Sequence, residues 1–191
     1  MPSIEEILAA RKNAKPKTAT VQVLLDDDTA DQIAQLEAEV DAIASNPDQR
    51  LGLPDGSAEL QERIKALRVA SVAQLVTFEF ERLPGDFWNY LTATNPVRPD
   101  SIIDLSYGYN LDAVVQKAAK AERGGHSFAW QVDDGKPVVL TGEQWDDVFG
   151  MLSGHDASAI RDAVWNLNEW GPAQALAEAK KASAGIETGS N

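Results

Sequence analysis

A strand followed directly by an aromatic helix constrains the fold of this chain more than any other stretch, and it lies in residues 76–98, VTFEFERLPGDFWNYLTATNPVR. Its first part alternates apolar with polar residues, which is the pattern of a strand with one buried face, and the apolar positions are Val76, Phe78 and Phe80. The Pro-Gly-Asp sequence at 84–86 then opens a helix whose inward face would carry Phe87, Trp88 and Leu91. Asn95-Pro96 stops that helix. The stretch is a packing unit and not an active site.

A helical hairpin is predicted ahead of this strand. A first strand at Val21–Leu25 is followed by three aspartates and a helix from about Thr29 to Asn46-Pro47. A loop rich in Pro, Gly and Asp (48–56) leads to a second helix, which Ser57 would cap. Both helices carry one apolar stripe, formed by Ile33, Leu36, Val40 and Ile43 in the first and by Leu60, Ile64, Leu67 and Ser71 in the second. The two helices should pair as an arm that projects from a small sheet of strands 21–25 and 75–83.

The second half of the chain is predicted to be mostly helical. Asn110 caps a helix that Gly124-Gly125 would end, and its inward residues are Leu111, Val114, Val115 and Ala118. A β-hairpin with an Asp-Gly turn is expected at Phe128–Leu140. Thr141 and Gln144 form a capping box before a helix that carries Trp145, Val148, Phe149 and Leu152 on one side and closes at Ser153-Gly154. Asp156 would cap the next helix, with Ile160, Ala163, Val164 and Leu167 inward, and Gly171-Pro172 would end it before an alanine-rich helix at 173–182.

These elements predict an α+β, mainly helical fold, with a small antiparallel sheet, a projecting antiparallel helical hairpin and a C-terminal helical bundle. The predicted regions are an N-terminal helix and linker (1–17), a strand–hairpin–strand–helix unit (18–99), a helical region with a β-hairpin (100–183) and a disordered tail (184–191). The N-terminal helix spans Ser3 to about Asn13, with Ser3 as its N-cap and Glu6 completing a capping box.

The charge of the chain excludes some classes of partner. Its 191 residues carry a formal net charge of −13, which repels phosphate backbones and anionic lipid and argues against binding of nucleic acid or membrane. Four basic residues form one N-terminal run (Arg11, Lys12, Lys15 and Lys17), interpreted as a solvated helix end with a tethering arm as the alternative. The sequence lacks a signal-peptide pattern and any run of about eighteen apolar residues. We therefore expect a soluble, acidic, intracellular protein.

No catalytic or metal-binding constellation is predicted. Cysteine is absent, and the two histidines, His126 and His155, lie beside glycines in no ligand spacing, so we interpret them as exposed loop residues. The aspartates at 26–28 lack the alternation of a calcium loop and are interpreted as helix-capping residues. The pairs Asp133-Asp134 and Asp146-Asp147 are adjacent only in sequence, and no nucleotide-binding or nucleophile motif occurs. We expect no enzyme activity and no cofactor.

The tryptophans are the candidate partner-binding residues, and those selected are Trp88, Trp145, Trp165 and Trp170. Without interleaved basic residues they should serve as core and interface anchors and not as base-stacking platforms. Trp165 lies off the apolar stripe of its helix and is the best candidate for an exposed contact, with ordinary helix packing as the alternative.

Several phrases of the sequence are similar to those of the tail assembly chaperones of siphophages that infect actinobacteria. The resemblance covers roughly Val21 to Trp170. It is carried by VQVLLDDDTADQIAQLEAEV, by VTFEFERLP and the helix with Asp86, Trp88 and Leu91, by Asn95-Pro96 and Tyr109-Asn110, by LTGEQWDDVFGMLSG at 140–154, and by the run Trp165-Asn166-Leu167-Asn168.

The resemblance implies a non-catalytic bacteriophage protein that binds the tape-measure protein and recruits tail-tube subunits during virion assembly. It also implies a place in the host cytoplasm, absence from the mature virion and, often, a longer form made by a programmed frameshift; self-association is a further expectation. Three alternatives stay open: a structural virion component such as a minor tail or head–tail connector protein, an enzyme of unrecognised type, and an unrelated adaptor.

Overall fold

A four-stranded antiparallel sheet with the strand order β1-β2-β5-β6 lies at the centre of the computed structural model, which describes residues 3–25, 28–45, 56–72 and 74–188. The strands are β1 (Thr18–Leu24), β2 (Leu75–Glu81), β5 (Ala129–Asp133) and β6 (Lys136–Val138), and a separate two-stranded ribbon pairs β3 (Glu122–Arg123) with β4 (His126–Ser127). The helices are α1 (Ile4–Asn13), α2 (Asp28–Ala44), α3 (Gly56–Val72), α4 (Gly85–Thr94), α5 (Ile102–Tyr107), α6 (Leu111–Ala119), α7 (Gly142–Met151), α8 (Gly154–Trp165) and α9 (Gly171–Thr188). The predicted α+β, mainly helical fold is confirmed.

Strand β2 is paired on both sides. Its full length pairs with β1, from Thr18 opposite Glu81 to Leu24 opposite Leu75, as predicted. On its other side it pairs with β5, the first strand of the predicted β-hairpin. That hairpin has the expected Asp-Gly turn, because Asp134 and Gly135 both have positive φ, 46° and 72°, which a type I′ turn requires. One sheet therefore contains strands from both of the regions predicted to divide at position 100.

The core fills one face of this sheet. The inward residues of β1 and β2 are Val21, Val23, Phe78 and Phe80, and helices α6, α7 and α8 cover them with Leu111, Val114, Trp145, Ile160 and Val164. The Trp145 ring lies 5.0 Å from the Phe78 ring and 5.9 Å from the Phe80 ring, centroid to centroid. The other face is polar, where Trp130 Nε1 donates to Glu79 at 3.1 Å. The alternation along residues 76–80 thus separates a buried face from a polar one.

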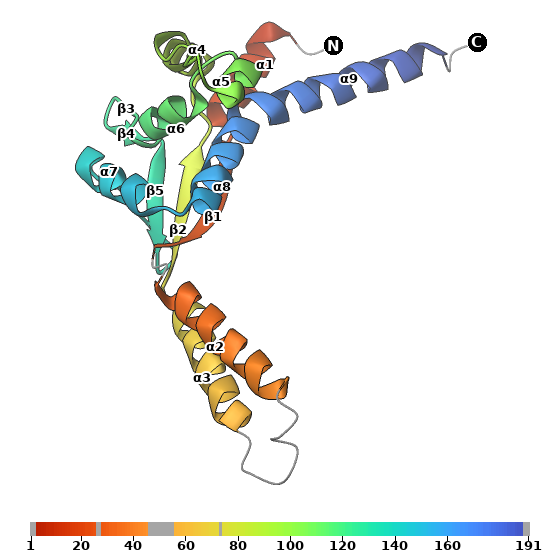
Figure 1. Ribbon diagram of the computed structural model, residues 1–191. Coiled ribbons are helices and arrows are strands. Elements are labelled where there is room, and N and C mark those ends of the chain that lie inside the picture. The colour runs from red at the N-terminus through yellow and green to blue at the C-terminus, as the bar shows by residue number, and fades with distance from the viewer. Residues whose placement is uncertain (1–2, 26–27, 46–55, 73, 189–191) are drawn as a thin grey trace.

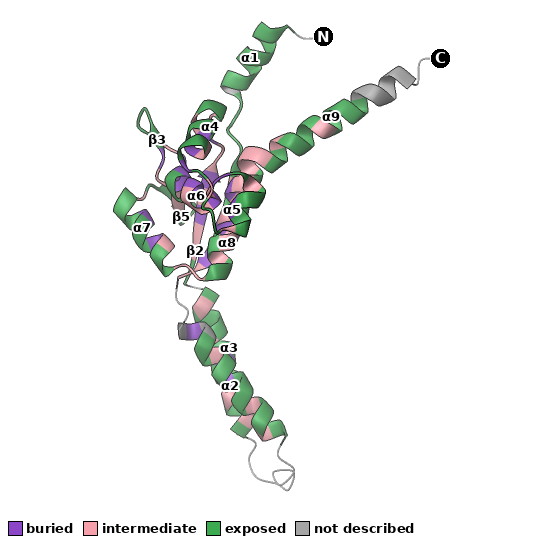
Figure 2. Ribbon diagram, turned by 45° about the horizontal axis from the view of Figure 1, so that its top comes forward, coloured by how far each residue is buried: buried purple, intermediate pink, exposed green. Residues whose placement is uncertain are grey.

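Helices α2 and α3 form an arm that projects from one end of the body, while α1 and α9 leave at the opposite end (Figure 1). Leu36 and Ile64 are the buried apolar residues among the described part of the arm, 8% and 7% exposed, and the other stripe residues are half-buried. The predicted hairpin is confirmed; most of its loop (46–55) lies outside the described residues. Figure 2 shows that buried residues gather in the body, whereas the arm, α1 and α9 are mainly exposed.

Helix ends follow local capping groups. The predicted capping boxes of α1 (Ser3 with Glu6) and α7 (Thr141 with Gln144) are both present. Asn95 ends α4, where its side-chain amide donates to the Leu91 carbonyl at 2.7 Å. Ser57, the predicted cap of the second arm helix, lies one residue inside α3.

Two further predicted helix boundaries, besides that at Ser57, are wrong. Helix α6 ends at Ala119, and Gly124 and Gly125 instead form the turn of the β3–β4 ribbon, where both have positive φ. The N-cap of α8 is Ser153 and not Asp156, because the Ser153 hydroxyl accepts from the Asp156 backbone N–H at 3.1 Å. The two glycines thus serve a turn of the next element, whereas Asp156 lies in the first turn of α8, where its carboxylate accepts from the Ser153 hydroxyl at 2.8 Å.

The last helix is longer than expected. The chain passes from α8 into α9 without the break predicted at Gly171-Pro172, and α9 extends to Thr188, past the start of the predicted disordered tail at 184. Pro172 directly follows the π-helical turn Asn166–Trp170, where the regular pattern of hydrogen bonds four residues apart is already interrupted, so its missing N–H is tolerated there. Residues 189–191 lie outside the described residues.

We predict that Leu36→Asp unfolds the arm and leaves the body folded. A carboxylate between α2 and α3 would be buried without a partner, at a cost of more than about 3 kcal/mol. Far-UV circular dichroism should lose the signal of α2 and α3, while tryptophan fluorescence stays unchanged, because all five tryptophans belong to the body. Leu36→Met, which conserves volume, is the control. A full helical signal, or loss of the tryptophan signal as well, would contradict the prediction.

Candidate functional site

The structure divides the four selected tryptophans into two groups. Trp88 and Trp145 are 5% and 1% exposed and lie in the core, so their rings are not available to a partner in the folded chain. Trp170 is 50% exposed, and Trp165 is half-buried. The Trp165 ring stacks on Trp170 at 5.7 Å and meets the edge of Tyr107 at 5.3 Å. Only Trp165 and Trp170 remain candidates for a contact surface.

A π-helical turn joins α8 to α9 and carries Trp170. It spans Asn166–Trp170, and the Gly171 N–H donates to the Asn166 carbonyl five residues before it. A Cβ atom on Gly171 would lie 2.8 Å from that carbonyl oxygen, which is too close for any other residue without a shift of the backbone. Glycine at 171 therefore serves this close approach and does not end the helix. Such π turns are rare and often occur at functional positions.

The carboxylate of Glu169, in the middle of this turn, accepts three hydrogen bonds. Trp88 Nε1 and the Tyr109 hydroxyl each donate to Oε1 at 2.8 Å, and Trp165 Nε1 donates to Oε2 at 3.2 Å. We call Glu169 with these three donors the Glu169 node. It connects the π turn to α4 and to the start of α6. Burial and the Glu169 carboxylate raise the pKa of Tyr109 well above its ordinary value, so its hydroxyl stays a donor.

Asn168 fixes the same turn to the sheet. Its side-chain oxygen accepts from the Leu83 backbone N–H at 3.0 Å, just beyond β2, and its amide donates to the Val164 carbonyl at 2.8 Å. The widened turn places Asn168 and Glu169 side by side toward the body, and both side chains are half-buried. The turn that carries Trp170 is therefore held by hydrogen bonds on two sides.

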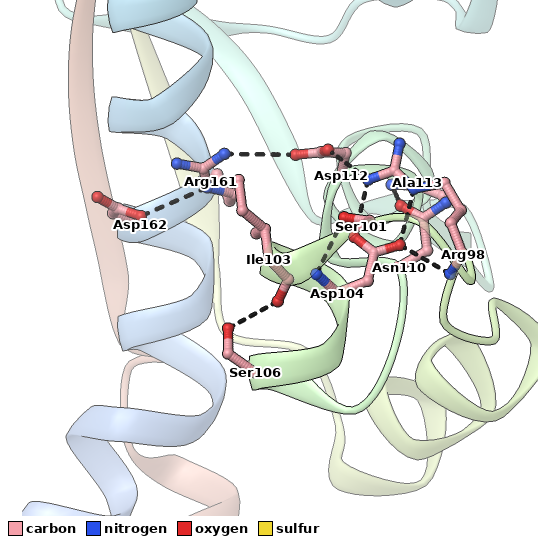
Figure 3. A network of polar contacts seen from close by, with 10 residues as sticks. All are labelled: Arg98, Ser101, Ile103, Asp104, Ser106, Asn110, Asp112, Ala113, Arg161 and Asp162. Atoms are coloured by element: carbon pink, nitrogen blue, oxygen red, sulfur yellow. Dashed lines mark hydrogen bonds and ion pairs between the residues drawn. The ribbon is translucent and has the colours of Figure 1, made fainter.

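Helix α5 lies beside this turn and is held by a network of charges (Figure 3). Arg98 Nε and Nη2 each donate to the Asp104 carboxylate at 2.7 Å, and the Arg98 backbone N–H donates to it at 3.0 Å. Arg98 also pairs with Asp112 at 3.0 Å, which in turn lies 3.6 Å from Arg161 of α8. The Arg98 hydrogen bonds hold the pKa of the fully buried Asp104 well below its ordinary value.

The outer face of α5 is apolar and exposed. Ile102 is 83% exposed, Leu105 62% and Ile103 48%, although they stand on a helix that is fixed from within by Asp104. We define the α5 patch as these three residues with Tyr107, Trp165 and Trp170, which are joined to α5 by the ring contacts of Tyr107 with Trp165 and of Trp165 with Trp170. Exposed large apolar residues on a rigid element, rimmed by charge, mark a surface for binding another protein.

Sequence reasoning missed α5 and selected only the tryptophans of this patch. A signal was present, because Ser101 and Asp104 have the spacing of a capped helix start, and the Ser101 hydroxyl does accept from the Asp104 N–H at 3.1 Å. This short helix was not predicted because it lies between two prolines, at 96 and 99, and the glycine at 108.

The other polar residues considered from the sequence lie apart. His126 and His155 are both exposed, and His126 Nε2 contacts Glu81 at 3.0 Å. Asp134 lies in the turn of the β-hairpin, and Asp146 pairs with Lys120 on the surface. Asp26 and Asp27 lie outside the described residues. Among the described residues, it is the α5 patch, and not these polar side chains, whose chemistry suits the recognition of an apolar surface.

We predict that Gly171→Ala destabilises the protein by about 1–3 kcal/mol, because its methyl group would overlap the Asn166 carbonyl. Gly150→Ala is the matched control on α7, where nothing lies within 4 Å of the added atom. It should be stabilising by about 0.5–1 kcal/mol. Urea unfolding followed by tryptophan fluorescence measures both. Shifts of equal sign and size would show that the close approach at Gly171 is unimportant.

We predict that stability falls in acid because of Asp104. Its pKa is lowered from 3.8 in the folded chain, so below that value the unfolded chain binds more protons, and folding loses stability from about pH 5 downward. Asp104→Asn should be less stable at pH 7 and show a flatter dependence on pH in this range. Urea midpoints across pH 2 to 7 test this, with Asp146→Asn as an exposed control. Parallel curves for wild type and Asp104→Asn would contradict it.

The chain was compared with known proteins. Among the residues that the structure describes, none form a group of three His, Cys, Asp or Glu placed to hold a metal ion, and no helix has the length and apolar character of a membrane span. No family model, curated protein or solved structure matches the chain.

Proposed function

We propose that this chain is a non-catalytic phage tail assembly chaperone that binds the tape-measure protein and recruits tail-tube subunits. The proposal draws on the resemblance in residues 21–170 and on the surface chemistry of the folded chain. It would act in the cytoplasm of the infected cell and would be absent from the completed virion.

The observation that carries the proposal is the α5 patch. It places Ile102, Leu105 and Trp170 in solvent on elements that the Arg98–Asp104 pair and the Glu169 node hold in place. Large apolar side chains that are exposed yet rigid lose little entropy when a partner covers them. Tryptophan anchors of this kind are typical of interface centres.

The partner that suits such a patch is a helix with one apolar face. Residues 102 and 105 are three apart on α5 and can meet the apolar ridge of a partner helix, and Trp170 adds a flat aromatic surface. A tape-measure protein would present many such helices in sequence. The net charge of −13 keeps the free chain soluble in spite of its exposed apolar residues.

Co-expression with the products of the neighbouring genes tests the proposal, by affinity capture of this chain and mass spectrometry of what it retains. The wild-type chain should capture a very long, helical protein. The double variant Ile102→Ser with Trp170→Ser should bind it at least about tenfold more weakly, because interface anchors contribute about 2 kcal/mol or more. Both positions are exposed, so the variant should fold.

The control is Val69→Ser with Met151→Ser, which removes two apolar side chains of similar exposure, 68% and 59%, away from the patch. It should capture as wild type does. Equal capture by both double variants would exclude the patch as the contact. Recovery of this chain from purified particles at fixed stoichiometry would overturn the chaperone proposal and indicate a structural virion component.

A further inference from the structure

A groove of about 810 Å³ lies at the end of the body opposite the arm. Its walls are the N-terminal linker, the segment just after β2 and the first turns of α9. Backbone hydrogen bonds fix the first two walls, because the Arg82 N–H donates to the Lys17 carbonyl at 2.9 Å and the Glu81 N–H to the Phe128 carbonyl at 2.7 Å. The groove is thus part of the fold and has the volume of a ligand site.

Four cations line this groove, Arg11, Lys15, Lys17 and Arg82. None of them makes an ion pair with any residue that the structure describes, whereas Arg98, Arg123 and Arg161 are all paired. The lining acid Glu81 is only 11% exposed and contacts His126. In a chain of net charge −13, this groove therefore concentrates unpaired positive charge in one place.

The groove also has an apolar floor. Leu83 and Phe128 close its base and are buried, so the apolar surface open to a ligand comes from the half-buried Pro84 and Pro172 and from Leu176 of α9, which is 57% exposed at the edge. A groove with an apolar floor and a cationic rim matches a helix or extended segment that is apolar on one side and acidic on the other.

We propose that this groove binds an acidic amphipathic segment of a partner protein. Nucleic acid fits it less well, since the apolar floor offers nothing to phosphates and the acidic remainder of the chain repels them. The cations would steer the segment by its carboxylates, and Leu176 and the floor would cover its apolar side. This inference is independent of the function proposed above, because it concerns a different surface.

Fluorescence anisotropy with a defined probe tests the proposal on the purified full chain. The probe is a fluorescein-labelled peptide of about 15 residues, roughly four helical turns, with leucines along one face and glutamates along the other. We expect it to bind, and the same peptide with lysine in place of each glutamate to bind at least about tenfold more weakly. Binding of the acidic peptide should weaken as salt is raised.

Charge-matched variants locate the site. Lys15→Glu with Lys17→Glu should weaken binding by about tenfold or more, whereas Arg63→Glu with Lys65→Glu changes the net charge equally at exposed cations of the arm, away from the groove, and should leave affinity within about twofold. Leu176→Ser should also weaken binding, and Met151→Ser, at similar exposure, should not.

Three outcomes would overturn the proposal. The first is that wild type fails to bind the acidic peptide. The second is that the two charge-reversal pairs weaken binding equally, which would reveal only an effect of net charge. The third is that a labelled single-stranded oligonucleotide of the same length binds more tightly than the peptide, which would make the groove a polyanion site.

Discussion

The pairing of β2 with strands on both sides is the constraint on which the rest of the structure depends. Phe78 and Phe80 lie two residues apart on β2 and therefore face the same side of the sheet, where Trp145 covers them, and the pairing with β1 and β5 fixes their place in it. The arm leaves from the end of β1 and returns into β2, so its base is set by the same ladder. The side chains of β1 and β2 that point to this buried face then determine where α6, α7 and α8 can pack.

Polar contacts decide how the last helices are placed on that core. Apolar burial is not directional, and it would allow α8 and α9 several orientations. The Glu169 node and Asn168 select one of them, because Trp88, Tyr109 and the Leu83 N–H would lose their acceptors in any other. The π turn supplies the extra residue that brings both side chains to the body, and Gly171 makes room for it.

Charge is distributed unevenly over the two candidate surfaces. Around α5 the charges neutralise one another through Arg98, Asp104 and Asp112, and the exposed residues are apolar. In the groove beside α9 the cations are unpaired among the described residues. The chain thus offers one surface suited to apolar helices and another suited to acidic segments, which would allow it to hold two different partners at once.

Local patterns in the sequence determined much of this protein: the alternation in β2, the apolar stripes of the arm, the Asp-Gly turn and two capping boxes depend on residues a few positions apart. Only the tertiary structure decided the placement of β5 against β2, the burial of Trp88 and the continuous passage from α8 to α9. Those features arise from contacts between residues far apart in the chain, such as Glu169 with Trp88 and Tyr109. A Gly-Pro pair reads locally as a helix end, and distant hydrogen bonds outweigh that preference here.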